Sequence, residues 1–158
     1  MFIKRGKAKI IRNSRKEKAI EICIETLDGK FYASAPSGKS KGKNEVPDYN
    51  SRGVLWSLKI ANLLLRKLES RSLDIKSLND LRNFENKIKE FEKAFGALGG
   101  NIVYAIETAL LKAKAKDCDQ ELWEIIFDFC AFDRKKIKFP MPVGNCIGGG
   151  LHSKGVSG

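Results

Sequence analysis

The chain has 158 residues, with 30 Lys and Arg against 19 Asp and Glu, which gives a net charge of +11. Apolar residues make up 42%, an ordinary share for a globular protein. This length fits one domain and excludes a complete TIM barrel, which needs about 250 residues. The sequence has no apolar run of about 18 residues and no signal-peptide pattern. We therefore expect a cytoplasmic protein with no membrane contact.

The positive charge is concentrated at the two ends of the chain. Residues 1–18 carry a net charge of +7 and residues 131–158 carry +4, whereas the middle is neutral. Basic ends can contact nucleic acid or an acidic partner, but solvation of a lysine-rich protein is the favoured explanation. No aromatic RNA-binding pattern or zinc finger accompanies the charge, so RNA binding is not favoured.

The cysteine pattern favours reduced, partly buried thiols. The four cysteines are Cys23, Cys118, Cys130 and Cys146. Their gaps are long and uneven, unlike those of metal sites or disulfide frameworks. Because His152 is the only histidine, the sequence also argues against a zinc site.

Alternation of apolar and polar residues predicts strands at the start of the chain. Residues 20–25 alternate with period two, as in a strand buried on one face. Asp28 and Gly29 favour a hairpin turn, and residues 31–35 repeat the alternation. With a further strand around residues 2–11, these segments predict a three-stranded antiparallel meander.

Residues 36–50 are almost devoid of apolar side chains and predict a long mobile loop. Apolar residues at helical spacing then predict helices around residues 54–68, 78–88, 101–113 and 122–129. Asn101 is expected to cap the third helix. Residues 139–147 suggest one more strand. Strands followed by helices indicate the α+β class.

One motif invites a nucleotide-binding interpretation. Residues 33–40, ASAPSGKS, nearly match the P-loop pattern GxxxxGK[ST], but Ala33 replaces the first glycine. A P-loop also needs a helix directly after it, and the next helix is expected only near Ser51. An independent NTP-binding enzyme is therefore not supported.

Four segments, in the same order along the chain, resemble the enolase family. Residues 13–15 and 20–22 resemble the family's DSRGNPTVEV opening, and residues 36–42 resemble PSGASTG. Residues 98–109 resemble LGANAILGVSLA, and residues 140–152 resemble LPVPMLNVINGGSH. Each match is short, but four in order cover nearly the whole chain.

The resemblance implies a domain organisation that agrees with the predicted elements. Residues 1–134 would be an N-terminal capping domain, with a three-stranded antiparallel meander followed by a helical bundle. Residues 135–158 would be the first strand and loop of a truncated TIM-type barrel. The implied reaction is the glycolytic conversion of 2-phosphoglycerate to phosphoenolpyruvate and water by phosphopyruvate hydratase, a lyase.

The resemblance also implies roles for individual residues. A lid over the substrate would contain Ser37, Gly38, Lys39 and Ser40, and Ser40 would contribute a ligand to a second Mg²⁺ ion. Gly149 and Gly150 would free the loop that carries His152, the implied catalytic residue at the phosphate side of the substrate. Two lid lysines, Lys39 and Lys41, replace uncharged family residues and would attract an anionic substrate.

The family's first-metal ligands, lysine base and glutamate acid lie in the barrel, beyond residue 158. We therefore expect no activity from this chain alone, and a barrel supplied in cis or in trans. Glu21 and Arg15 match positions at the family's subunit contact, which implies a homo-oligomer. The alternative function is a stand-alone capping domain that binds RNA or another anionic partner.

Overall fold

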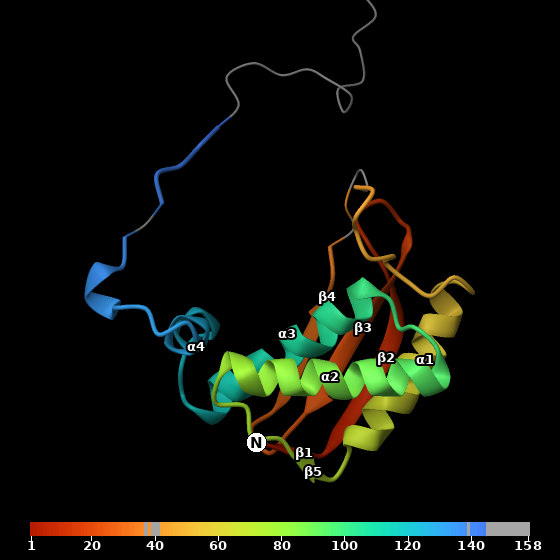
Figure 1. The fold of residues 1–158 in the computed structure, drawn as a ribbon, viewed down its shortest axis with the longest axis horizontal. Coiled ribbons are helices and arrows are strands. Elements are labelled where there is room, and N and C mark those ends of the chain that lie inside the picture. Colours follow the sequence, from red (N-terminus) through yellow and green to blue (C-terminus); the bar gives the residue numbers. More distant parts are fainter. Residues whose placement is uncertain (37, 39–41, 139, 145–158) are drawn as a thin grey trace, which may run out of the picture.

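The computed structural model describes residues 1–36, 38, 42–138 and 140–144. Figure 1 shows that the strands of the main sheet come before the helices along the chain, as expected for the α+β class. The strands are β1 (Phe2–Ile3), β2 (Arg5–Arg12), β3 (Lys18–Glu25), β4 (Lys30–Ser34) and β5 (Arg71–Ser72). The helices are α1 (Val54–Leu68), α2 (Leu78–Phe95), α3 (Gly100–Asp117), α4 (Leu122–Phe129) and the short 3₁₀ helix η1 (Arg134–Lys136).

The predicted antiparallel meander is confirmed. Its strand order is β2-β3-β4, and Ile22 of β3 lies between Ala8 of β2 and Ala33 of β4. Thr26 donates its backbone N–H to the Gly29 carbonyl at 2.9 Å, which closes the expected turn between β3 and β4. Period-two alternation therefore aims one set of side chains from all three strands at a common face.

The first predicted strand is divided in two. β2 joins the meander, whereas β1 pairs with β5 in a separate two-stranded sheet. β5 follows α1 directly, and Ser70 donates its N–H to the Ile3 carbonyl at 2.8 Å. The end of α1 therefore positions β5 beside β1, a pairing that no local pattern in the sequence predicted.

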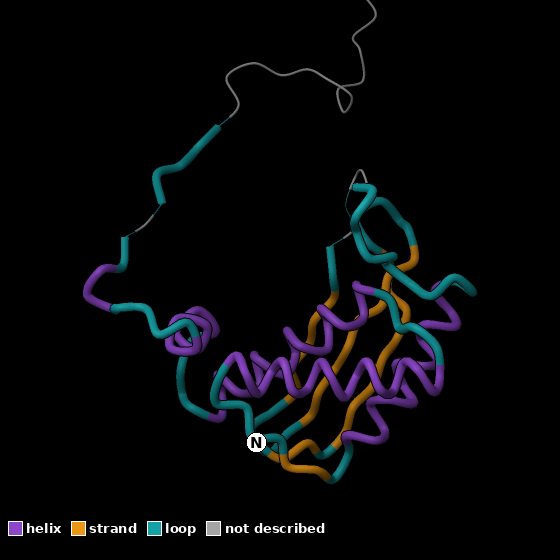
Figure 2. The backbone as a smooth tube through the Cα atoms, in the orientation of Figure 1, coloured by secondary structure: helices purple, strands orange, loops and turns teal. Residues whose placement is uncertain are grey.

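In the part of the chain that the structure describes, helices cover one face of the meander, which we call the inner face; the opposite one is the outer face. α1 packs against β2 and β3, and α3 packs against β3 and β4. Figure 2 shows α2 crossing this region on the same side of the meander as α1 and α3. It packs on α1, where Lys67 lies over the rings of Phe91 and Phe95, at 5.2 and 4.5 Å from their centroids.

One continuous core lies between the inner face and the helices. Ile22 and Ile24 are fully buried against Leu65 of α1 and against Ile102 and Ile106 of α3. Each such isoleucine or leucine contributes about 1.5–3 kcal/mol by leaving water. Gly6 permits the close approach of α1, because a Cβ there would lie 2.9 Å from the Cβ of Leu65.

Some expectations need correction. Asn101 does not cap α3, because the helix begins at Gly100 and Gly99 occupies the cap position without a side-chain hydrogen bond. Residues 140–144 form no strand, and the rest of the expected 139–147 strand lies outside the described residues.

Cys23, Cys118 and Cys130 are free thiols, but Cys118 is exposed rather than partly buried. Cys146 lies outside the described residues. Within the described ranges, no helix has the length and apolarity needed to cross a membrane.

Candidate functional site

The side chain of Asn13 makes three hydrogen bonds within the turn between β2 and β3. Its Oδ1 accepts hydrogen bonds from the backbone N–H groups of Arg15 and Glu17, both at 2.9 Å. Its Nδ2 donates to the Glu17 carboxylate at 2.7 Å. Lys16 adopts a φ of 62°, in the left-handed region that is uncommon for residues other than glycine and that occurs in tight turns. The turn therefore holds Arg15 in a defined position.

Arg15 connects this turn to the predicted lid. Its Nη2 donates to the Gly38 carbonyl at 3.1 Å, while its Nε lies 3.4 Å from the Glu17 carboxylate. The hollow between the turn and the start of the lid has a volume of about 500 Å³ and includes Pro36. The first end of the lid thus lies against the β2–β3 turn.

The second end of the loop that contains the predicted lid is attached to the start of α3. The backbone N–H of Gly100 donates to the Pro47 carbonyl at 2.9 Å, and that of Asn101 donates to the Asp48 carbonyl at 3.2 Å. The first N–H groups of a helix have no partner within the helix, so the loop satisfies two of them. The segment that resembles the family's LGAN motif is therefore an anchor for the loop.

Gly99 makes this attachment sterically feasible. Its φ is +98°, and a Cβ at this position would lie 2.4 Å from the Tyr49 Cα and 2.5 Å from the Asp48 carbonyl oxygen. Both the backbone conformation and the close approach exclude a side chain. The loop and the α2–α3 connection touch backbone to backbone at this point.

Sequence reasoning missed a second part of the anchor. Ser57 is fully buried in α1; its hydroxyl accepts from the Asn50 N–H at 2.8 Å and donates to the Leu98 carbonyl at 2.7 Å. Asn50 Nδ2 donates to the Ala97 carbonyl at 2.6 Å. A serine between the apolar residues of α1 was the available signal, because a buried hydroxyl needs partners.

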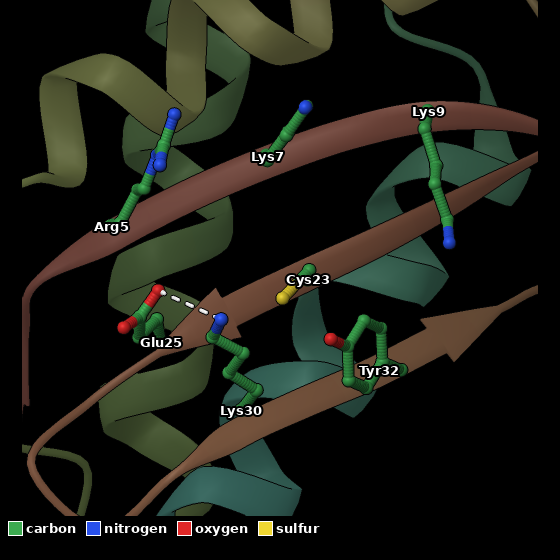
Figure 3. A pocket seen from close by; sticks show the side chains of 7 residues that line it. All are labelled: Arg5, Lys7, Lys9, Cys23, Glu25, Lys30 and Tyr32. Atoms are coloured by element: carbon green, nitrogen blue, oxygen red, sulfur yellow. Dashed lines mark ion pairs between the residues drawn. The ribbon is translucent and has the colours of Figure 1, made fainter.

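On the outer face, Glu21 is paired within the chain. Its Oε1 lies 2.7 Å from the ammonium of Lys9 on β2, and this hydrogen bond and charge raise the pKa of Lys9. Figure 3 shows the neighbouring part of this face, where Cys23 lies beside Tyr32. The hydrogen bond to Cys23 and the thiol's charge when ionised raise the pKa of the Tyr32 hydroxyl.

A larger groove lies beside the second anchor of the lid loop. It has a volume of about 1180 Å³ and is bounded by residues 46–56, the end of α2 and the start of α3. Glu107 on α3 lines it; burial, and then the nearby Glu85 of α2, raise its pKa to about 7. At neutral pH this carboxyl is therefore partly protonated.

The structure brings two of the predicted site residues together, Arg15 and Gly38. Glu21 lies on the outer face with Lys9 as its partner. The other predicted site residues lie outside the described residues: Ser37, Lys39, Ser40, Gly149, Gly150 and His152. Within the described part of the chain, no three His, Cys, Asp or Glu side chains cluster in a way that could hold a metal ion.

Comparison with known proteins agrees with this architecture. The family model described as "Enolase, N-terminal domain" matches residues 3–126. The chain is 31% identical over 145 residues to an enolase of Methanosphaera stadtmanae, covering 90% of this chain and 33% of the relative. It is 29% identical over 154 residues to that of Methanosarcina acetivorans, covering 92% and 34%. It is 34% identical over 161 residues to that of Saccharolobus islandicus, covering 96% and 35%.

The chain thus spans about a third of the length of the curated relatives it matches. The family model covers the meander, α1 to α3 and the first half of α4, which include both attachment points of the loop between β4 and α1. The chain belongs to the enolase family, and residues 3–126 form its enolase N-terminal domain.

Proposed function

We propose that residues 1–134 act as the capping domain of an enolase that converts 2-phosphoglycerate to phosphoenolpyruvate and water. The observation that carries this proposal is the attachment of the lid loop at both ends. Arg15 binds the Gly38 carbonyl, and Gly100 and Asn101 bind carbonyls of Pro47 and Asp48. A loop fixed at two places on a rigid scaffold can present the residues between them to a substrate.

The lid residues have roles that follow from the family resemblance. Ser37, Gly38, Lys39 and Ser40 would cover the substrate and exclude water from it. Lys39 would add positive charge near the substrate's phosphate. His152, with Gly149 and Gly150 before it, would approach the phosphate from residues 135–158, the proposed start of the barrel domain.

The magnesium chemistry belongs to a larger site than the described residues form. When bound, Mg²⁺ neutralises the charge that accumulates on the substrate carboxylate during proton removal. The described residues contain no metal-binding cluster, and Ser40, the one implied ligand in this chain, lies outside them. The contribution we assign to the described residues is therefore the positioning of the lid.

The proposed partners are the remainder of an enolase, in cis or in trans, and a second subunit. Several large apolar side chains at the end of the described chain are exposed, including Trp123 and Ile126 of α4 and Phe132 after it. Exposed apolar groups of this kind are typical of contact surfaces. Glu21 and Arg15 would contribute to the subunit contact.

The test is complementation. The chain alone, with Mg²⁺ and 2-phosphoglycerate, should form no phosphoenolpyruvate, because a lid serine and a loop histidine cannot remove an unactivated carbon proton. Addition of the C-terminal two thirds of the Saccharolobus islandicus enolase should produce turnover, measured by phosphoenolpyruvate absorbance. Turnover by the chain alone would contradict the assignment. A physical complex of the chain with the added fragment that shows no turnover would contradict it too.

Variants of the chain then test which of its residues contribute to turnover in the complex. Ser40→Ala should weaken use of the second Mg²⁺, and His152→Ala should lower turnover without affecting assembly. The matched control is Ser70→Ala, at a turn far along the chain from the lid. The relatives reported above are all named enolase, and none of them supports the alternative of a stand-alone capping domain that binds RNA or another anionic partner. The cytoplasmic location stays a prediction.

A further inference from the structure

A cleft lies between α1 and α2, at a place that neither the lid nor the meander reaches. Its lining residues, among those that the structure describes, come from the second half of α1, from residues 71–73 and from α2. Its volume of about 430 Å³ is within the range of small-molecule sites. Along α2 the lining extends from Phe84 to Phe95, which is about three helical turns or about 16 Å. The cleft is therefore long relative to its volume.

The floor of the cleft is apolar and recessed. Five large apolar side chains that line it each expose 9% of their surface or less: Leu64, Leu68, Phe84, Ile88 and Phe91. Phe95, at one end of the lining, exposes 40% and stacks on Phe91 with ring centroids 4.7 Å apart. A helix is about 10 Å wide with its side chains and would lie across such a floor, whereas a single extended chain can enter.

The rim of the cleft is basic. Lys67, Arg71 and Lys87 line it and are exposed, and the one carboxylate among the described lining residues is that of Glu90. In the described ranges, none of these three cations has a carboxylate within ion-pair distance. The Lys67 ammonium instead lies over the rings of Phe91 and Phe95. Three positive charges therefore face one negative charge above an apolar floor.

We propose that this cleft binds the anion of a free fatty acid. The acyl chain would lie along the floor, where each methylene group that leaves water adds to the affinity. The carboxylate would lie at the rim, where the unpaired cations attract it. A chain of about twelve carbons matches the span of about three helical turns. This inference does not depend on the lid or on the proposed function.

Other occupants fit the cleft less well. A protein surface would meet the cations, but it would reach little of a floor whose apolar side chains are nearly all buried. Insertion into a membrane needs apolar side chains that protrude, and Phe95 is the one large apolar side chain of the described lining that is exposed. A second copy of the cleft would oppose cations with cations on a chain of net charge +11.

The test uses the full chain and a dansyl-labelled undecanoate, whose fluorescence rises when it leaves water. Unlabelled dodecanoate, kept below the concentration at which it forms micelles, should displace the probe. The double variant Arg71→Glu/Lys87→Glu should weaken dodecanoate binding about tenfold, because two attractive charges become repulsive. The control Arg66→Glu/Lys93→Glu makes the same change of charge at exposed positions of α1 and α2 outside the cleft, and it should have less than about a twofold effect.

Two further measurements separate the cleft from nonspecific apolar binding. The variant Trp123→Gln/Ile126→Gln, which removes exposed apolar groups from α4, should bind dodecanoate within about twofold of the unmodified chain. Dodecanol, which has the same chain length but no charge, should displace the probe at least about tenfold less well than dodecanoate. Equal displacement by dodecanol, equal weakening by the two charge variants or loss of binding in the α4 variant would each overturn the proposal.

Photolabelling locates the site without any substitution. A fatty acid that carries a diazirine on its chain, irradiated with the unmodified protein and read by mass spectrometry, should label residues 64–73 and 84–95. Labels confined to α4 would contradict the assignment. Binding to vesicles of an anionic phospholipid, without displacement of the probe by dodecanoate, would replace the free fatty acid with a membrane surface and overturn the proposal as well.

Discussion

The side-chain amide of Asn62 on α1 makes two hydrogen bonds to the backbone of Ala8 on β2. The Ala8 N–H donates to Asn62 Oδ1 at 2.9 Å, and Asn62 Nδ2 donates to the Ala8 carbonyl at 3.1 Å. A primary amide presents an N–H donor and a carbonyl acceptor side by side, as a neighbouring strand would, and its second N–H donates to the Leu58 carbonyl at 3.0 Å. On the opposite edge, Lys112 of α3 donates to the Tyr32 carbonyl of β4 at 2.8 Å. The helices therefore cover the inner face and also occupy backbone groups at both edges.

Asn62→Leu tests the importance of this edge contact. The substitution leaves the N–H and C=O of Ala8 without these partners in a partly buried place, so we expect a loss of about 2 kcal/mol in the free energy of unfolding. Urea denaturation followed by circular dichroism measures it. Asn83→Leu, at an exposed position of α2, is the control and should change stability by less than about 0.5 kcal/mol. Equal effects of both changes would show that the edge contact contributes nothing.

Gly99→Ala tests the anchor of the lid loop. A methyl group at Gly99 would overlap the backbone of Asp48 and Tyr49, in addition to the cost of a positive φ. Gly53 has a similar φ of +92° but open space around the missing Cβ, so Gly53→Ala isolates the conformational cost. We expect losses of about 1 kcal/mol for Gly53→Ala and at least about 3 kcal/mol for Gly99→Ala. Equal losses in thermal or urea unfolding would contradict the backbone contact.

Glu107 should make stability fall as pH rises. Burial and Glu85 raise its pKa to about 7, above its usual 4.5, so the folded chain holds a proton that the unfolded chain releases. The stabilisation that comes from this bound proton is complete below about pH 4.5 and is lost as pH rises through about 7. Glu107→Gln should flatten the decline in unfolding free energy over that range.

The size of the Glu107 effect is limited by solvent. The side chain is only half-buried, so Glu107→Gln should stabilise the protein by about 1 kcal/mol at pH 8. Glu90→Gln, at an exposed position of α2, serves as the control for the change in net charge. The hydrogen bond from Ser77 lowers the pKa of Asp80, so Asp80 loses its contribution only in stronger acid, outside this window. An unchanged pH profile in Glu107→Gln would contradict the prediction.

Local patterns predicted most of the fold. The alternation in residues 20–25 predicted β3 and its buried face, and the helical spacing after residue 54 predicted the four helices. These patterns succeed because burial on one side imposes a period on the sequence. The pairing of β1 with β5 was missed, since two-residue strands have no period and their pairing depends on where α1 ends.

The candidate site was less accessible to sequence reasoning. The resemblance to enolases indicated the lid, but nothing local indicated that Arg15 binds Gly38 or that Ser57 joins Asn50 to Leu98. The Arg15–Gly38 and Ser57–Leu98 bonds join residues 23 and 41 positions apart along the chain. Asn101 was expected to act as a cap because of its side chain, yet the position is fixed by its backbone N–H. Backbone contacts of this kind leave no residue-type signal other than a glycine such as Gly99.

The exposed apolar side chains of α4 should make the isolated chain associate with itself. Trp123 and Ile126 expose 51% and 43% of their surface, and Phe132 exposes 62%. Trp123→Gln/Ile126→Gln should lower the average mass in light scattering towards that of a monomer, because less apolar surface is left to bury. Leu55→Gln/Leu63→Gln removes two exposed leucines from α1 and should leave association unchanged.

If α4 is also the contact with the rest of an enolase, the α4 variant should lose complementation while its circular dichroism spectrum stays that of the unmodified chain. A chain that is monomeric at high concentration without any substitution would contradict this prediction.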